Sequence, residues 1–70
     1  MPLSMIRLGE KRTIQDFRVG GELRRHLNSL GFIKGEQVEV IGDGPGGFIL
    51  LVKGVKLAIN KGLANKILVD

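Results

Sequence analysis

The sequence lacks cysteine, tryptophan and tyrosine, and it has one histidine and two prolines among 70 residues. Without cysteine the chain cannot form a disulfide or a thiolate metal site, and one histidine cannot complete a Cys/His zinc site. Neither serine has a positioned base nearby in the sequence, so the inventory for nucleophilic catalysis is almost empty. We therefore expect a domain held together by packing alone, and we do not expect an enzyme or a bound cofactor.

Long apolar runs are also missing. The longest, Phe48 to Val52, is far shorter than the roughly 20 residues that a transmembrane helix needs. Residues 1–8 contain no apolar stretch of the length typical of signal peptides, about 7 to 15 residues. We expect a cytoplasmic protein that does not insert into membranes.

The charge is modestly basic. Eleven Lys and Arg against seven Asp and Glu give a formal net charge of +4, and the basic residues are spread along the chain without a polybasic run. This charge favours acidic partners weakly and does not by itself indicate nucleic acid. With 43% hydrophobic and 26% charged residues, the chain has the composition of an ordinary globular domain.

Hydrophobic periodicity predicts five short strands and one helix. The first strand is expected over residues 11–19, with Ile14 and Phe17 buried and a bulge between them. The glycine-rich stretch 42–47 is expected to be an irregular hairpin tip. The other strands are expected around Val38 and Val40 and over residues 48–52, 55–59 and 67–69, with a short turn over residues 61–65 before the last strand.

Residues 22–30 are expected to form the helix, because Leu23, Leu27 and Leu30 lie at the i, i+4 and i+7 spacing of one helical face. Gly31 is placed to end the helix in a left-handed conformation, with Phe32 folding back onto Leu27. The predicted core contains these leucines and Phe32, together with Val38, Val40, Leu50, Val55, Leu57, Ile59, Ile67 and Val69.

A sheet this small exposes its edges and one face unless it curls on itself. We predict that residues 1–70 form a single domain that is mainly β. Its fold is expected to be a small SH3-like five-stranded barrel, with one α-helix between strands one and two and a short helical turn before the last strand.

Three features of the sequence are candidate sites. The glycine cluster at residues 42–47 precedes a strand and lacks the Gly-Lys-Ser/Thr ending of a phosphate-binding loop, so we interpret it as a hairpin. Glu22 and His26, four residues apart on the helix, are the weak candidates for metal ligands, but two ligands are too few for a closed site. Arg24 and Arg25 lie side by side on the polar part of the helix, which fits either a docking face or a solvated one.

The run Leu-x-x-Leu-Gly-Phe-x-x-Gly extends from Leu27 to Gly35. On this run the sequence resembles the FeoA family, and the similarity extends over nearly the whole chain. The remaining matching segments are Pro2-Leu3-Ser4, Leu23-Arg24-Arg25-His26, Val38-Glu39-Val40, Pro45-Gly46-Gly47, Ala58-Ile59 and Leu63-Ala64.

This resemblance implies an SH3-like accessory protein of bacterial ferrous iron uptake and iron homeostasis, in a family associated with transition metal ion binding. Its implied partner is the cytoplasmic part of the FeoB transporter, which it would support or regulate. The two protruding features of the expected barrel are the partner-binding candidates. They comprise Arg24, Arg25 and His26 on the helix and Asp43, Gly46, Gly47 and Phe48 on the hairpin.

Two alternatives stay open at this point. A small basic barrel can bind nucleic acid through strands that carry aromatic side chains. The chain also resembles the SH3-like domain of iron-dependent repressors and could be a stand-alone relative of it. The sequence leaves open whether copies of the chain associate weakly.

Overall fold

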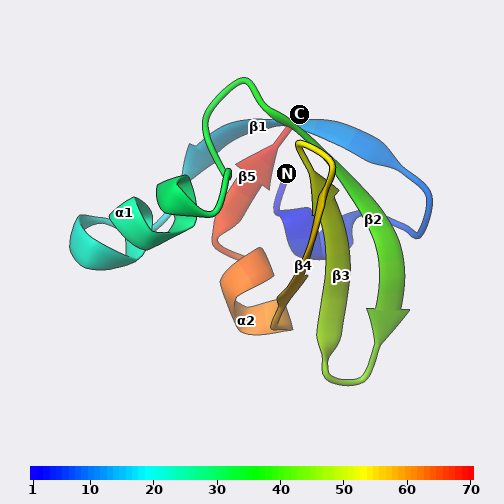
Figure 1. Cartoon of the computed structure of the whole chain (residues 1–70). Helices are drawn as coiled ribbons and strands as arrows, with labels where there is room; N and C mark the ends of the chain where they lie inside the picture. Colours follow the sequence, from blue (N-terminus) through cyan, green and yellow to red (C-terminus); the bar gives the residue numbers. More distant parts are fainter.

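A computed structural model describes all residues from 1 to 70. It contains a 3₁₀ turn, five strands and two α-helices, arranged as in Figure 1. Their bounds are η1 Leu3–Met5, β1 Lys11–Phe17, α1 Gly21–Ser29, β2 Gln37–Gly44, β3 Gly47–Val52, β4 Val55–Ile59, α2 Lys61–Ala64 and β5 Ile67–Val69. The predicted order of strands and helices is confirmed. Neither helix has the length and apolarity needed to cross a bilayer.

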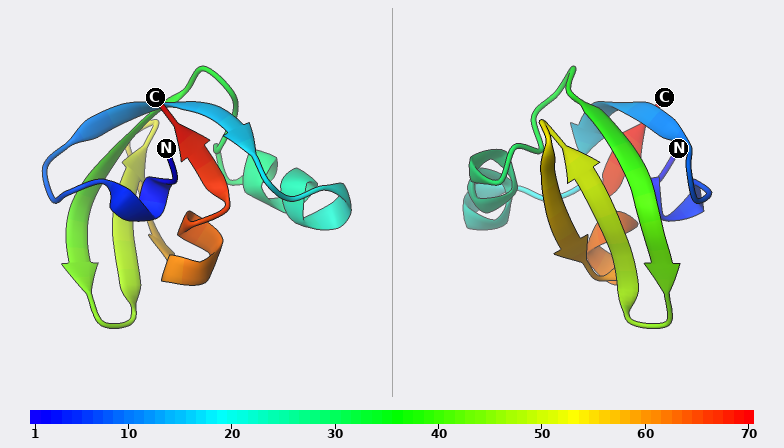
Figure 2. Two further views of the ribbon diagram at one scale, coloured as in Figure 1. Left: turned by 180° about the vertical axis from the view of Figure 1, so that it is seen from behind. Right: turned by 45° about the vertical axis from the view of Figure 1, so that its right-hand side comes forward.

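All five strands belong to one antiparallel sheet in the order β4-β3-β2-β1-β5. The sheet bends around the core instead of lying flat (Figure 2). The register of β1 against β5 shifts between Ile14 and Asp16, which confirms the predicted bulge. The extra residue turns the side chains of both Ile14 and Phe17 into the core, although they are three positions apart.

The core is one cluster of 15 buried side chains. Every strand and both α-helices contribute to it, as does Leu3 of the N-terminal 3₁₀ turn. The buried residues are Leu3, Ile6, Ile14, Phe17, Leu27, Phe32, Val38, Val40, Phe48, Leu50, Val52, Ile59, Ala64, Ile67 and Val69. The prediction was wrong for Val55, which is 53% exposed at the start of β4, and Leu57 is only partly buried.

Helix α1 stands beside the barrel and is anchored through its C-terminal end (Figure 1). The Phe32 N–H donates to the Leu27 carbonyl at 3.0 Å, the Gly31 N–H donates to the Asn28 carbonyl, and Gly31 has φ +104°. This is the predicted Schellman ending, and both Leu27 and Phe32 are buried. Leu23 and Leu30 were predicted to be buried as well, but each is 39% exposed, because α1 projects from the barrel and nothing covers the rest of its apolar face.

The glycine-rich segment is more regular than predicted. Strands β2 and β3 stay paired as far as Gly44 and Gly47, so only Pro45 and Gly46 form the turn. Gly47 has φ +139°, and a Cβ built there would lie 2.3 Å from the Ile59 carbonyl oxygen. Glycine is therefore needed at this position so that the hairpin can pass close to the end of β4.

Candidate functional site

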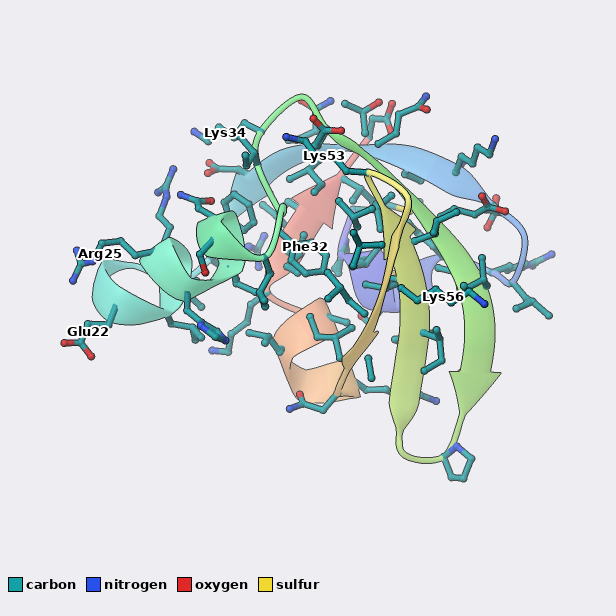
Figure 3. The ribbon with its side chains drawn as sticks, in the orientation of Figure 1. Glu22, Arg25, Phe32, Lys34, Lys53 and Lys56 are labelled. Carbon is teal, nitrogen blue, oxygen red and sulfur yellow. The ribbon has the colours of Figure 1, made fainter.

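The three predicted docking residues on α1 have different environments. The Arg24 guanidinium lies 5.6 Å from the centroid of the Phe17 ring, and its Nη2 is 4.0 Å from Asp16 Oδ1. Arg25 forms no ion pair and projects from the outer end of α1, as does Glu22 (Figure 3). His26 is exposed and lines a groove towards β4. Arg25 is therefore the unpaired basic residue of α1, and the acidic Glu22 at the same end is also without an ion pair.

Asp16 organises the base of the same helix. The Phe17 N–H donates to Asp16 Oδ1 at 2.8 Å, and Lys34 Nζ lies 3.4 Å from the same oxygen. The hydrogen bond from the Phe17 N–H lowers the pKa of Asp16 below its ordinary value of 3.8, and Lys34 lowers it further. Arg24 contributes more weakly to the same shift. Its side chain is 52% exposed, so solvent screens these interactions.

The predicted docking residues on the hairpin line an open hollow of about 490 Å³ between the hairpin tip and the end of β4. Lys61 Nζ lies 3.6 Å from Asp43 Oδ1 and 5.5 Å from the centroid of the Phe48 ring, so this lysine bridges α2 to the hairpin. Phe48 is only 3% exposed and belongs to the core. Asp43 and Gly46 remain as accessible residues here, whereas Gly47 is set by backbone packing.

A second hollow, a groove of about 160 Å³, lies between α1, β4 and α2. Seven of its nine lining residues are hydrophobic, including the half-exposed Leu30 and the partly buried Leu57 and Leu63. Both hollows are lined by Ala58, Ile59 and Asn60. The two surfaces predicted separately from the sequence therefore meet at the end of β4.

Sequence reasoning missed this meeting point. Leu57 was assigned to the core and Leu63 to a turn, Ala58 was named only for the family resemblance, and Lys61 was not singled out. The signal that could have found them is the short length of strand 55–59 and its Lys56, since short strands that carry lysine are typical of the edge of a sheet.

The weak metal candidates gain no third ligand. Glu22 and His26 are both exposed on α1. No group of three His, Cys, Asp or Glu side chains in the structure is placed to hold a metal ion. The fold thus presents surfaces for binding and no assembled cluster of metal-ligating groups.

Comparison with known proteins identifies the family. A model of the FeoA domain matches residues 1–70. The chain belongs to the FeoA family. A protein of Methanocaldococcus jannaschii named "Putative Fe(2+) transport protein A" is 33% identical over 69 residues, which cover 99% of this chain and 84% of that protein. FeoA proteins are small accessory domains of ferrous iron transport and are not a known enzyme family.

Solved FeoA structures share the fold. The crystal structure of an iron uptake regulatory protein, FeoA, has a TM-score of 0.90 and 35% identity, and the match covers 99% of this chain and 92% of that one. The zinc complex of Stenotrophomonas maltophilia FeoA, described as a prokaryotic SH3 domain protein, has a TM-score of 0.82 and 29% identity over 100% of this chain and 89% of that one. The predicted SH3-like fold is confirmed.

Proposed function

We propose that this FeoA protein acts in the cytoplasm by binding the cytoplasmic part of a FeoB-like ferrous iron transporter and supporting or regulating its uptake activity. The observation that carries the proposal is the match of the FeoA domain to residues 1–70, because its relatives include a protein named for Fe(2+) transport. The physical inventory agrees: the chain offers open surfaces and a formal charge of +4, which suits an acidic protein partner.

The proposed docking surface is the region where the two hollows meet. His26 lines one hollow from α1, and Asp43 and Gly46 line the other from the hairpin. Arg25 lies next to His26 in the sequence and projects from the outer end of α1. These elements flank β4, whose residues line both hollows. Arg24 is a poorer candidate than Arg25 because its guanidinium is already paired with Phe17 and Asp16.

The test measures binding of the purified cytoplasmic region of a FeoB-like transporter to the immobilised chain by biolayer interferometry. We expect saturable binding, and we expect Arg25→Glu to slow association and weaken it. Lys11→Glu is the matched control, since Lys11 is exposed at the start of β1 and its reversal changes the net charge equally. Absence of binding by the parent chain contradicts the proposed function, whereas equal losses in both variants contradict the docking surface.

A further inference from the structure

The outer edge of β4 carries backbone groups without a partner. The turn between β3 and β4 has two residues with positive φ, Lys53 at +52° and Gly54 at +76°, which closes a two-residue hairpin. In such a hairpin the flanking pair Val52 and Val55 exchanges backbone hydrogen bonds, as does every second pair after it. The N–H and C=O groups of Lys56 and Ala58 therefore point away from β3.

Nothing in the chain takes up these groups. The backbone and side-chain hydrogen bonds outside the regular strand pairing include none to Lys56 or Ala58, and both residues are exposed. The other edge of the sheet, formed by β5, has hydrogen-bond partners within the chain. There the Val69 N–H donates to the Met1 carbonyl and the Met1 amine to the Val69 carbonyl, each at 2.7 Å, and Pro2 bridges to Leu68. The N-terminal segment covers the β5 edge, while β4 stays open on the side of α1 (Figure 2, right).

The side chains along this edge form an incomplete apolar surface. Val55, Leu57 and Ile59 share one face of β4, and they change from exposed through partly buried to buried along the strand. The groove of about 160 Å³ is lined by Leu57 and Ile59, and its other walls include Leu30 and Leu63. An engineered apolar cavity of about 150 Å³ holds a benzene molecule, so the groove has room for one large apolar side chain.

The charge at the edge selects the kind of occupant. Lys56 forms no ion pair and extends from β4 away from α1 (Figure 3). A second copy of this chain would bring another β4 lysine and another charge of +4 to the same edge, and lysine on an edge strand opposes such self-pairing. An acidic side chain on an added strand would instead pair favourably with Lys56 across the strands.

We infer that β4 is a docking strand, onto which an extended segment of the protein partner adds as a further strand of the sheet. Side chains on the two faces of this segment differ. On one face an apolar side chain enters the groove beside Leu57, and on the opposite face an acidic side chain lies next to Lys56. Main-chain hydrogen bonds to Lys56 and Ala58 supply affinity, and the groove and the lysine supply specificity. This inference rests on the proposed function, because it names how the transporter's cytoplasmic region is recognised.

Amide hydrogen exchange of the full chain tests the inference directly. In the free protein the amides of Lys56 and Ala58 are expected to exchange quickly, and those of Leu57 and Ile59 slowly, because only the latter pair with β3. On addition of the transporter's cytoplasmic region, Lys56 and Ala58 should become protected. Binding without this protection overturns the docking strand and leaves the proposed function standing, whereas no binding at all overturns both.

A backbone variant provides a second, independent arm. Ala58→Pro replaces the outward N–H with a ring carbon, at the type of edge position where proline is tolerated, and should weaken binding at least about tenfold, the loss expected for one hydrogen bond. Ala58→Ser keeps the N–H and should bind like the parent, and the β3–β4 cross-strand signals in the NMR spectrum establish that each variant is folded. Unchanged binding by folded Ala58→Pro contradicts the inference. Protection of Lys56 and Ala58 that rises with the concentration of the chain alone assigns the edge to self-association and also overturns it.

Discussion

At the scale of single residues, the glycines of the hairpin are not equivalent. A Cβ at Gly47 would lie 2.3 Å from the Ile59 carbonyl oxygen and 2.9 Å from the Asn60 Cα, and the backbone there has φ +139°. At Gly46 a Cβ would meet nothing within 4 Å, and the residue is exposed in the turn. Gly46, which follows Pro45, can therefore carry a side chain without a steric clash. Gly47 cannot, because the end of β4 passes close to it.

Gly47→Ala is therefore expected to destabilise the fold by about 2 kcal/mol or more, since the new methyl group displaces backbone and not a flexible side chain. Gly46→Ala should change the free energy of unfolding by no more than about 0.5 kcal/mol. Urea denaturation followed by circular dichroism compares the two variants with the parent. Similar midpoints for both would show that the hairpin tip can move away from Ile59.

A second residue-scale prediction concerns acid stability. The pKa of Asp16 lies below its ordinary value of 3.8, chiefly through the hydrogen bond from the Phe17 N–H and then through Lys34. The folded chain thus binds this proton less tightly than the unfolded chain. The contribution of Asp16 to stability is present above about pH 3.8 and is lost as the pH falls through the lower folded-state value.

Replacement by Asn should remove this contribution at neutral pH and flatten the acid limb of the stability profile below about pH 3.8. Urea midpoints of Asp16→Asn and the parent across this range measure the effect, and an NMR titration of the Asp16 carboxyl group gives its pKa. A titration at or above the ordinary value contradicts the role assigned to Phe17 and Lys34.

At the scale of elements, α1 is attached to the barrel through one end. Leu27 is fully buried, and the Schellman hydrogen bonds fix the chain into Phe32, whereas Leu23 remains 39% exposed. Leu27→Ala should lower the free energy of unfolding by about 2 to 5 kcal/mol, the range for a buried leucine. Leu23→Ala should cost far less, and thermal denaturation of both variants measures the difference. Equal costs would mean that the whole helix face packs against the barrel.

The difference between these leucines shows what helical periodicity can predict. Spacing identifies the apolar face of a helix, but burial depends on whether another element covers that face. The same reasoning explains Val55. Its position in the alternating pattern predicts a side chain that faces the core, but no other element covers the start of β4. Sequence patterns that specify a local backbone geometry were more reliable. Gly31 with Phe32 predicted the end of α1, and the spacing of Ile14 and Phe17 predicted the bulge.

The hairpin illustrates the opposite error. Four glycines in six residues suggest an irregular loop, because glycine is unfavourable in strands. The ladder nevertheless continues to Gly44 and Gly47, since pairing with β3 and the close approach of β4 decide the local structure. The candidate site was predictable only in part for a related reason: its two halves were visible in the sequence, and their meeting at Ala58 depends on the fold.

At the scale of the whole molecule, the distribution of aromatic and basic side chains bears on the nucleic-acid alternative. All three phenylalanines, Phe17, Phe32 and Phe48, are buried, so no aromatic ring is free to stack with a base. Five of the eleven basic residues are engaged in ion pairs within the chain: Arg12, Arg24, Lys34, Lys53 and Lys61. The basic residues without an ion pair are scattered along the chain, and no exposed aromatic ring accompanies them.

We therefore expect single-stranded RNA and duplex DNA to bind no more tightly than the weak end of non-specific binding, about 10⁻⁴ M at physiological salt. Fluorescence anisotropy with labelled oligonucleotides over a salt series measures both the affinity and its salt dependence. Since each phosphate contact releases counterions, a chain that uses few lysines should give a shallow slope. Submicromolar binding that falls steeply with salt would favour a nucleic-acid partner. Binding of that strength would have to come from Arg7, Lys11, Arg18, Arg25, Lys56 and Lys66, the basic residues without an ion pair.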